Sequence, residues 1–176
     1  MSNYGHIVLA NSKKGLVPSI IRYITKSQYS HSLLTIPDII NIPMCMEAAD
    51  SGVTMLRFDK GYTENKDQDI SVFEVNIPDE DKNNALVICL NSLEIRYGYL
   101  ELFWFIWRAF NKFIGRDIKN QDNWVENGII CSELCRMYLT YAGLGRLFKE
   151  FGNGALNAED LRQIMLANPT LFTKIR

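Results

Sequence analysis

The sequence predicts a single α+β domain, and three observations lead to this prediction. The first half of the 176-residue chain holds short apolar runs bounded by Pro, Asp, Gly or Asn, which is typical of strands with short connections. The second half holds longer patterns that begin with acidic residues and continue with helical spacing. Strands followed by helices favour an antiparallel sheet packed against helices over alternating βαβ units.

Five runs have the length and β-branched or apolar character of strands, and they cover residues 6–10, 32–36, 44–49, 53–58 and 70–77. Between the third and fourth runs, Asp50-Ser51-Gly52 is typical of a hairpin turn. Consecutive strands with such short connections are expected to pair in an antiparallel sheet.

Helices are expected at residues 16–24, from 78 through 95, at 100–112, at 132–141 and from 157 to 166. Pro18 lies in the first turn of the first helix, where proline is tolerated. Asn157 is positioned to cap the last helix, and Gly143 follows the end of the one before it. A polar loop is expected at 115–127.

Composition places the chain among ordinary globular proteins. Hydrophobic residues make up 47% and charged residues 22%, and the formal net charge is -1. A nucleic-acid-binding role is not expected, because such proteins usually carry a strong basic excess. No repeat or linker is evident, so residues 1–176 are expected to form one domain.

No targeting or membrane-spanning segment is evident in the sequence. The N-terminal residues lack a basic patch followed by an apolar run. The longest apolar stretch, 99–110, is too short to span a bilayer and is interrupted by Glu101 and Arg108. We therefore expect a soluble, cytoplasmic protein, and export by another route such as cell lysis stays open.

The segment around Cys131 carries the strongest chemical signal. Ile129-Ile130 leads the chain into Cys131 at the expected start of a helix, where free N–H groups and the positive dipole end stabilise a thiolate. The same N–H groups suit the oxyanion of a tetrahedral intermediate. The alternative is a buried structural cysteine, which is our interpretation of Cys45, Cys89 and Cys135.

His31 is the candidate base, because a neutral imidazole can take the thiol proton and return it to a leaving group. His6 is its competitor, but no polar neighbour in the sequence would orient its ring. Glu47 lies in an apolar run, where a carboxylate is costly unless paired, so it is the candidate that orients the imidazole. Asp50 is the second choice. Each could instead be a surface or edge-strand residue.

Several short motifs, taken in chain order, resemble the circularly permuted branch of the NlpC-type papain-like cysteine hydrolases, and within it the YiiX-like group. In that branch the histidine strand precedes the cysteine helix. His6 replaces the family's usual aspartate, and Ile129 and Ile130 stand where an aromatic residue is often found. The matching elements are Gly5-His6-Ile7-Val8-Leu9, Tyr29-Ser30-His31, Glu47-Ala48, Tyr97-Gly98-Tyr99-Leu100-Glu101 and Cys131-Ser132-Glu133-Leu134.

The resemblance implies a permuted papain-like fold, a sheet or half-barrel against helices, with Cys131 as nucleophile, His31 as base and Glu47 as third polar residue. It implies a bacterial or phage peptidase or amidase that acts on a peptide-like amide or an ester through a thioester. Neither a metal nor a cofactor is expected. Two alternatives are a lipid-directed acyltransferase or thioesterase, and a binding module without catalysis.

The aromatic stretch 97–113 leaves three interpretations open. It includes three kinds of aromatic side chain on more than one helical face, which is typical of a buried helix. It could instead form an apolar groove for an acyl chain, or lie on a membrane with Arg108 and Lys112 near headgroups. The sequence leaves the oligomeric state open.

Overall fold

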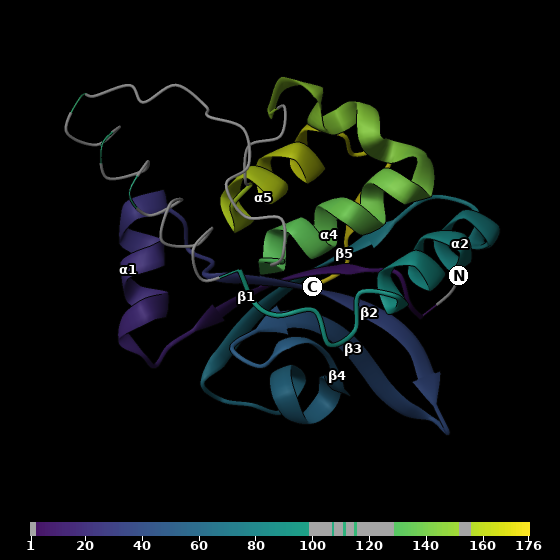
Figure 1. Cartoon of the computed structure of the whole chain (residues 1–176), viewed down its shortest axis with the longest axis horizontal. Coiled ribbons are helices and arrows are strands. Elements are labelled where there is room, and N and C mark those ends of the chain that lie inside the picture. The colour runs from purple at the N-terminus through teal and green to yellow at the C-terminus, as the bar shows by residue number, and fades with distance from the viewer. Residues whose placement is uncertain (1–2, 99–106, 108–110, 112–114, 116–128, 152–155) are drawn as a thin grey trace.

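The computed structural model confirms the α+β class, with one six-stranded antiparallel sheet in the order β4-β3-β2-β1-β5-β6. The structure describes residues 3–98, 107, 111, 115, 129–151 and 156–176. Figure 1 shows α2, α4 and α5 gathered on one side of the sheet, and α1 at the left of the view.

The five predicted strands are present as β1 to β5, with somewhat different ends. A sixth strand follows the last helix and pairs with β5; three residues are too few to show a strand pattern in the sequence. The strands are β1 (Ile7–Ser12), β2 (His31–Ile39), β3 (Ile42–Ala49), β4 (Gly52–Arg57), β5 (Gln68–Val75) and β6 (Phe172–Lys174).

The helices are α1 (Leu16–Thr25), α2 (Asp79–Leu90), α4 (Cys131–Leu139) and α5 (Ala158–Ala167). Shorter turns are the π-helical η1 (Asp59–Thr63) and η2 (Thr140–Leu144) and the 3₁₀-helical η3 (Gly145–Phe151). The predicted helix at 100–112 and loop at 115–127 lie outside the described residues, apart from isolated positions. No helix in the described ranges is long and apolar enough to cross a membrane.

The helix predicted to reach Ile95 ends at Leu90 instead. Glu94 adopts a left-handed conformation with φ 70°, and the chain from there runs extended beside the start of β4. Glu94 N–H donates to Val53 O at 3.0 Å, and Val53 N–H donates to Ile95 O at 2.9 Å. The apolar residues after Leu90 therefore reach the core from a turn and the non-helical segment that follows it, which the helical spacing of the sequence did not reveal.

Two tight hairpins set the register of β2, β3 and β4. Ile40 and Asn41, both with positive φ, form the two-residue turn between β2 and β3. The predicted Asp50-Ser51-Gly52 turn is confirmed between β3 and β4, where Ala49 pairs with Gly52. The first hairpin matters most for the site, because it makes the strands that carry His31 and Glu47 neighbours.

Alternating side chains of the sheet build two cores. In β1, Ile7 and Leu9 join the main cluster with α2, α4 and α5 residues, while Val8 and Ala10 join a smaller cluster with Leu33 and others on the opposite face. The smaller cluster contains Cys45 and Tyr62 as well. Since the strand period is two, this division follows directly from the sequence of the strands.

Candidate active site

Cys131 is the first residue of α4, as the sequence predicts. The lead-in pairs with the segment after α2: Ile129 N–H donates to Arg96 O at 3.2 Å, and Gly98 N–H donates to Ile129 O at 3.3 Å. The Glu133 carboxylate accepts from Ile130 N–H at 3.2 Å, which satisfies one of the free donors at the helix start. These contacts fix the end of the helix that carries the thiol.

His31 and Glu47 meet across the β2–β3 hairpin. The register pairs Leu34 with Met46, so Glu47 lies diagonally across from His31 on the same face of the sheet. His31 Nε2 lies 2.8 Å from Glu47 Oε2. The side chains are 21% and 14% exposed, which leaves the pair mostly shielded from water but open at one side.

Cys131 completes a row of three side chains. Cys131 lies beside the His31 ring, close enough for each of the two groups to shift the pKa of the other. Because Nε2 faces Glu47, Nδ1 is the ring nitrogen left for the sulfur. The structure therefore brings together all three predicted residues, in the order Cys131, His31, Glu47.

Tyr62 is a fourth member that sequence reasoning missed. Its hydroxyl donates to Glu47 Oε2, the same oxygen that faces His31. Tyr62 lies in η1, and its ring packs near Phe58 with 6.0 Å between the ring centroids. The sequence does not reveal this role, because Tyr62 is a single tyrosine in a polar stretch. One π-helical turn is too short to produce a periodic pattern.

The electrostatics favour an ion pair between Cys131 and His31. Burial alone would raise the pKa of the Cys131 thiol, but the His31 charge and hydrogen bonds from His31 and the Ser32 backbone lower it. Burial would lower the pKa of the His31 ring, but Cys131 and Glu47 raise it. Burial would likewise raise the pKa of the Glu47 carboxyl, but His31 and Tyr62 lower it. Each of these pKa shifts is in the direction that favours the charged form of the group, which is the thiolate, the imidazolium and the carboxylate respectively.

The remaining candidates are placed elsewhere. Cys45, Cys89 and Cys135 are buried free thiols, and burial raises the pKa of each, to about 12 for Cys89. His6 is buried directly before the start of β1, and this burial lowers the pKa of its ring. Asp50 lies exposed in the β3–β4 turn, and it is Glu47 that contacts His31.

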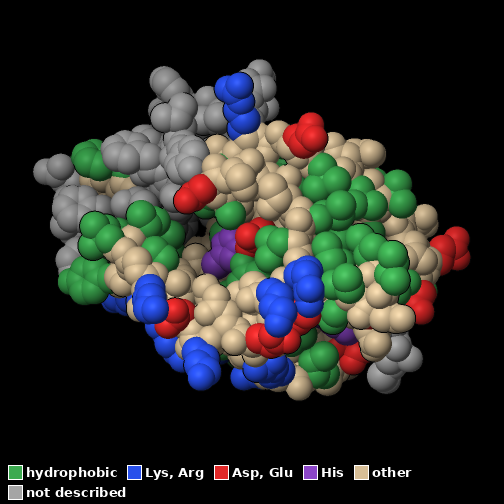
Figure 2. Space-filling model, turned by 90° about the horizontal axis from the view of Figure 1, so that it is seen from below, with side chains coloured by type: hydrophobic (Ala, Val, Ile, Leu, Met, Phe, Trp, Pro, Cys, Tyr) green, Lys and Arg blue, Asp and Glu red, His purple; other side chains and the backbone are tan. Residues whose placement is uncertain are grey.

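Figure 2 shows how this side of the molecule is shaped. Seen from below, one of the two histidine rings lies recessed in a hollow, with hydrophobic and acidic side chains at its edge. A thiolate beside an imidazolium can attack a carbonyl carbon, and the imidazolium can protonate a leaving group. The arrangement of Cys131 and His31 is therefore chemically suited to acyl transfer.

The fold is that of a YiiX-like α+β protein. The crystal structure of the metalloprotein YiiX from Escherichia coli O157:H7 is similar to this chain with a TM-score of 0.67 and 12% sequence identity, covering 99% of this chain and 97% of that chain. At this identity the similarity defines the fold alone. No protein-family profile matches the sequence, and no curated protein is similar to it at a significant level.

That neighbour is called a metalloprotein, so the fit of the present residues to a metal ion is relevant. Within the described part of the chain, no group of three or more His, Cys, Asp and Glu side chains surrounds a common point. The Nε2 of His31 already has Glu47 Oε2 at 2.8 Å as its hydrogen-bond partner. These residues do not fit a three-ligand metal site.

Proposed function

We propose that this chain is a cysteine peptidase or amidase of the papain-like type, with Cys131 as nucleophile, His31 as acid and base, and Glu47 as the group that orients the imidazole. The observation that carries the proposal is the meeting of these three side chains: Glu47 Oε2 lies 2.8 Å from His31 Nε2, and Cys131, the first residue of α4, lies beside the same ring. Nucleophile, base and orienting group in contact are the components that acyl transfer requires.

The first half of the proposed reaction transfers the acyl group to the enzyme. The Cys131 thiolate attacks the carbonyl carbon of an amide or ester, and the first-turn N–H groups of α4 hold the resulting oxyanion. The intermediate collapses as the C–N or C–O bond breaks, and His31 gives its proton to the departing amine or alcohol. The products of this half are a thioester on Cys131 and a neutral imidazole.

The second half returns the enzyme to its starting state. His31 takes a proton from water, and the hydroxide attacks the thioester carbonyl. Collapse releases the carboxylic acid and restores the thiolate and imidazolium. Glu47, held by Tyr62, keeps the ring in one orientation through both halves.

Acetylation by p-nitrophenyl acetate tests the proposal without knowledge of the natural substrate. We expect a rapid burst of p-nitrophenolate, one per chain, and an acetyl group on Cys131 in peptide mapping. Cys131→Ser should lose the burst, and Cys135→Ala, one turn further along the same helix, should keep it. Acetylation spread equally over the four cysteines would contradict the proposal.

Alkylation measures the thiolate directly. At pH 6, iodoacetamide should modify Cys131 much faster than a model thiol, because its pKa is lowered by His31. The three buried cysteines should stay unmodified until the protein is unfolded, since burial raises the pKa of each thiol. A rate at Cys131 no greater than that of the model thiol would remove the basis for an activated nucleophile.

One observation favours a second candidate, a lipid-directed acyltransferase or thioesterase with the same three residues. The apolar side chains of α1 are strongly exposed, with Leu16 and Tyr23 each at 77% and Val17 at 54%. Figure 2 shows hydrophobic side chains gathered on the left, the side where α1 lies in Figure 1. An amphipathic helix of this kind suits contact with a lipid surface, and only residues 26–30 separate α1 from His31.

Vesicle sedimentation separates the two candidates. A lipid-directed enzyme should bind vesicles of phosphatidylcholine and phosphatidylglycerol, and Leu16→Asp or Tyr23→Asp should release it. Val87→Asp is the matched control, because Val87 is a 59% exposed apolar residue of α2. Absence of vesicle binding favours the peptidase or amidase. The proposed membrane contact of 97–113 falls outside the described residues and stays a prediction.

A further inference from the structure

Residues 156–160, called here the α5 start, contact both parts of the chain that carry the proposed catalytic pair. Ser132, the residue after Cys131, is only 2% exposed, and its hydroxyl donates to the Leu156 carbonyl oxygen at 2.5 Å. Leu156 is fully buried and directly precedes Asn157, the N-cap of α5. The beginning of α4 is therefore connected to the α5 start by a hydrogen bond that is shielded from water.

The segment that leads into His31 reaches the same α5 start. Ser27 lies between α1 and β2, and its hydroxyl accepts from Tyr29 N–H at 2.9 Å and donates to Glu159 Oε2 at 3.3 Å. The Tyr29 hydroxyl donates to Ser71 Oγ on β5 at 2.8 Å. The backbone just before His31 is therefore connected to the α5 start on one side and to the sheet on the other.

A capping box and an ion pair hold the α5 start in one conformation. Asn157 Oδ1 accepts from the N–H groups of Glu159 and Asp160, at 2.7 and 3.0 Å. In return, Asp160 Oδ2 accepts from Asn157 N–H at 2.9 Å. The Glu159 carboxylate also accepts from Nε and Nη2 of Arg162, at distances of 2.6 to 3.0 Å. Because these contacts fix the Glu159 carboxylate, its hydrogen bond with Ser27 has a defined direction.

We propose that the α5 start sets the position of Cys131 relative to His31, with Ser132 and Glu159 as positioning residues. This inference rests on the proposed function, because it concerns the same nucleophile and base. The attraction between a thiolate and an imidazolium weakens as the two groups move apart. Loss of either connection should therefore raise the pKa of the Cys131 thiol, although neither side chain is the nucleophile or the base.

Two variants of the full chain remove one connection each. Ser132→Ala keeps the backbone N–H groups of α4, and Glu159→Ala changes a side chain that is 20% exposed. In both we expect alkylation of Cys131 by iodoacetamide at pH 6 to slow about fivefold, with the midpoint of its pH profile displaced upward. Glu159→Gln should retain most of the wild-type rate, because its amide oxygen still accepts from Ser27.

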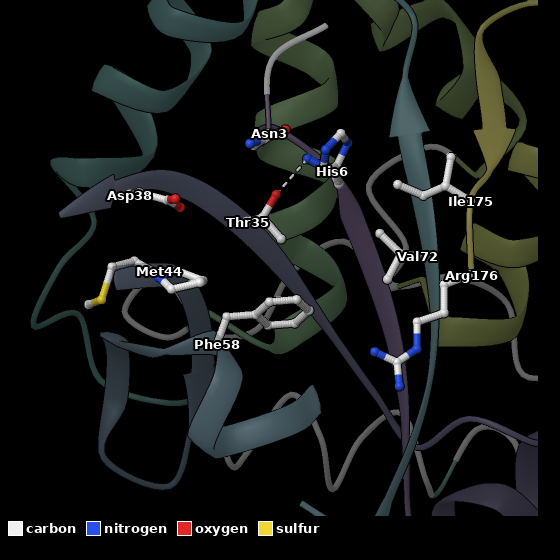
Figure 3. Close-up of a pocket in the computed structure, with 10 residues that line it drawn as sticks. Asn3, His6, Thr35, Asp38, Met44, Phe58, Val72, Ile175 and Arg176 are labelled. Carbon is white, nitrogen blue, oxygen red and sulfur yellow. Dashed lines mark hydrogen bonds between the residues drawn. The ribbon is translucent and has the colours of Figure 1, made fainter. Parts of the chain in front are cut away.

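Thr35→Val is the matched control for the loss of a buried hydroxyl. Thr35 also lies on β2, and its Oγ1 accepts from His6 N–H at 2.9 Å (Figure 3). This contact lies at a separate cavity, and none of the described residues that line the cavity belongs to the proposed catalytic site. Thr35→Val should lower the free energy of unfolding in urea and leave the pH profile of Cys131 alkylation unchanged.

The outcomes separate this inference from the proposed function. If wild-type Cys131 reacts rapidly and either folded variant, Ser132→Ala or Glu159→Ala, keeps the wild-type pH profile, this inference is overturned and the proposed function stands. An equal displacement in Thr35→Val would also overturn it, because lower stability alone would then explain the change. If Ser132→Ala does not fold, Glu159→Ala decides alone. A wild-type Cys131 that reacts like a model thiol would overturn the proposed function and this inference together.

Discussion

His31 Nε2 and Glu47 Oε2 lie 2.8 Å apart, on strands joined by a two-residue turn. The Glu47 oxygen at this contact also accepts from the Tyr62 hydroxyl. A carboxylate held on both sides in a mostly buried position stays ionised, and it favours the protonated imidazole. The state of the Cys131 thiol is therefore set in part by residues that do not touch it.

Removing the charge of Glu47 should make Cys131 less reactive. In Glu47→Gln the imidazolium loses its carboxylate, so the pKa of His31 falls and less thiolate forms at low pH. We expect the rate of alkylation by iodoacetamide at pH 6 to fall about tenfold, with the midpoint of its pH profile displaced upward. Glu80→Gln, an exposed change on α2, should match the wild type. An unchanged midpoint in Glu47→Gln would show that Glu47 does not act on the pair.

Tyr62→Phe should produce a smaller change in the same direction. The variant keeps the ring packed near Phe58 but removes the hydroxyl that donates to Glu47. One neutral donor contributes about 1 kcal/mol, so we expect a fall of roughly fivefold in the alkylation rate at pH 6. The double variant Tyr62→Phe/Glu47→Gln should be no slower than Glu47→Gln alone, because the hydroxyl acts through the carboxylate. If the losses in alkylation rate added up in the double variant, Tyr62 would act on Cys131 in a way that does not involve Glu47.

Acid should destabilise the wild type more than Glu47→Gln. The pKa of Glu47 is lower in the fold than the ordinary value of 4.5, so the unfolded chain takes up a proton first as the pH falls. The contribution of Glu47 to stability is present above about pH 4.5 and is lost as the pH falls through the folded-state pKa. Urea unfolding from pH 7 to pH 3 should show the two stability curves drawing closer below pH 4.5. If the two stability curves stayed parallel below pH 4.5, the pKa of Glu47 would not be lowered in the folded protein.

Gly52→Ala should cost more than Gly143→Ala, although both glycines have positive φ, 96° and 83°. A Cβ on Gly52 would lie 2.4 Å from the Ile95 carbonyl oxygen, whereas one on Gly143 would meet nothing within 4 Å. We expect losses of at least about 2 kcal/mol for Gly52 and about 1 kcal/mol for Gly143 in urea unfolding. Equal losses would mean that Ile95 moves away without resistance.

The sequence located the three side chains of the candidate site because each stands out locally. Cys131 follows an apolar lead-in at a helix start, and Glu47 is a lone charge in an apolar strand. Both signals follow from short-range physics, namely the unsatisfied groups of a helix end and the cost of an unpaired buried carboxylate. The contact between Glu47 and His31 then depends on the β2–β3 register, which the hairpin fixes.

Other features depend on tertiary contacts that carry no local signal. Tyr62 reaches Glu47 only because η1 folds over the sheet, and nothing in the sequence around it marks that turn. The apolar Leu93 and Ile95 continue a helical spacing, yet they pack on the core from the turn after α2 and the residues that follow it. Asp38 and Arg176 line one cavity although they lie far apart in the sequence.

His31 and Glu47 lie only 16 positions apart on one hairpin, whereas Cys131 lies in the other half of the chain. Short-range pairs form early in folding and distant ones late, because closing a long loop requires more entropy. Until α4 docks, the sulfur has no imidazolium beside it and behaves as an ordinary thiol. If Cys131 is the nucleophile that we propose, an activated thiolate forms only in the finished tertiary structure, and a partly folded chain carries an ordinary thiol at this position.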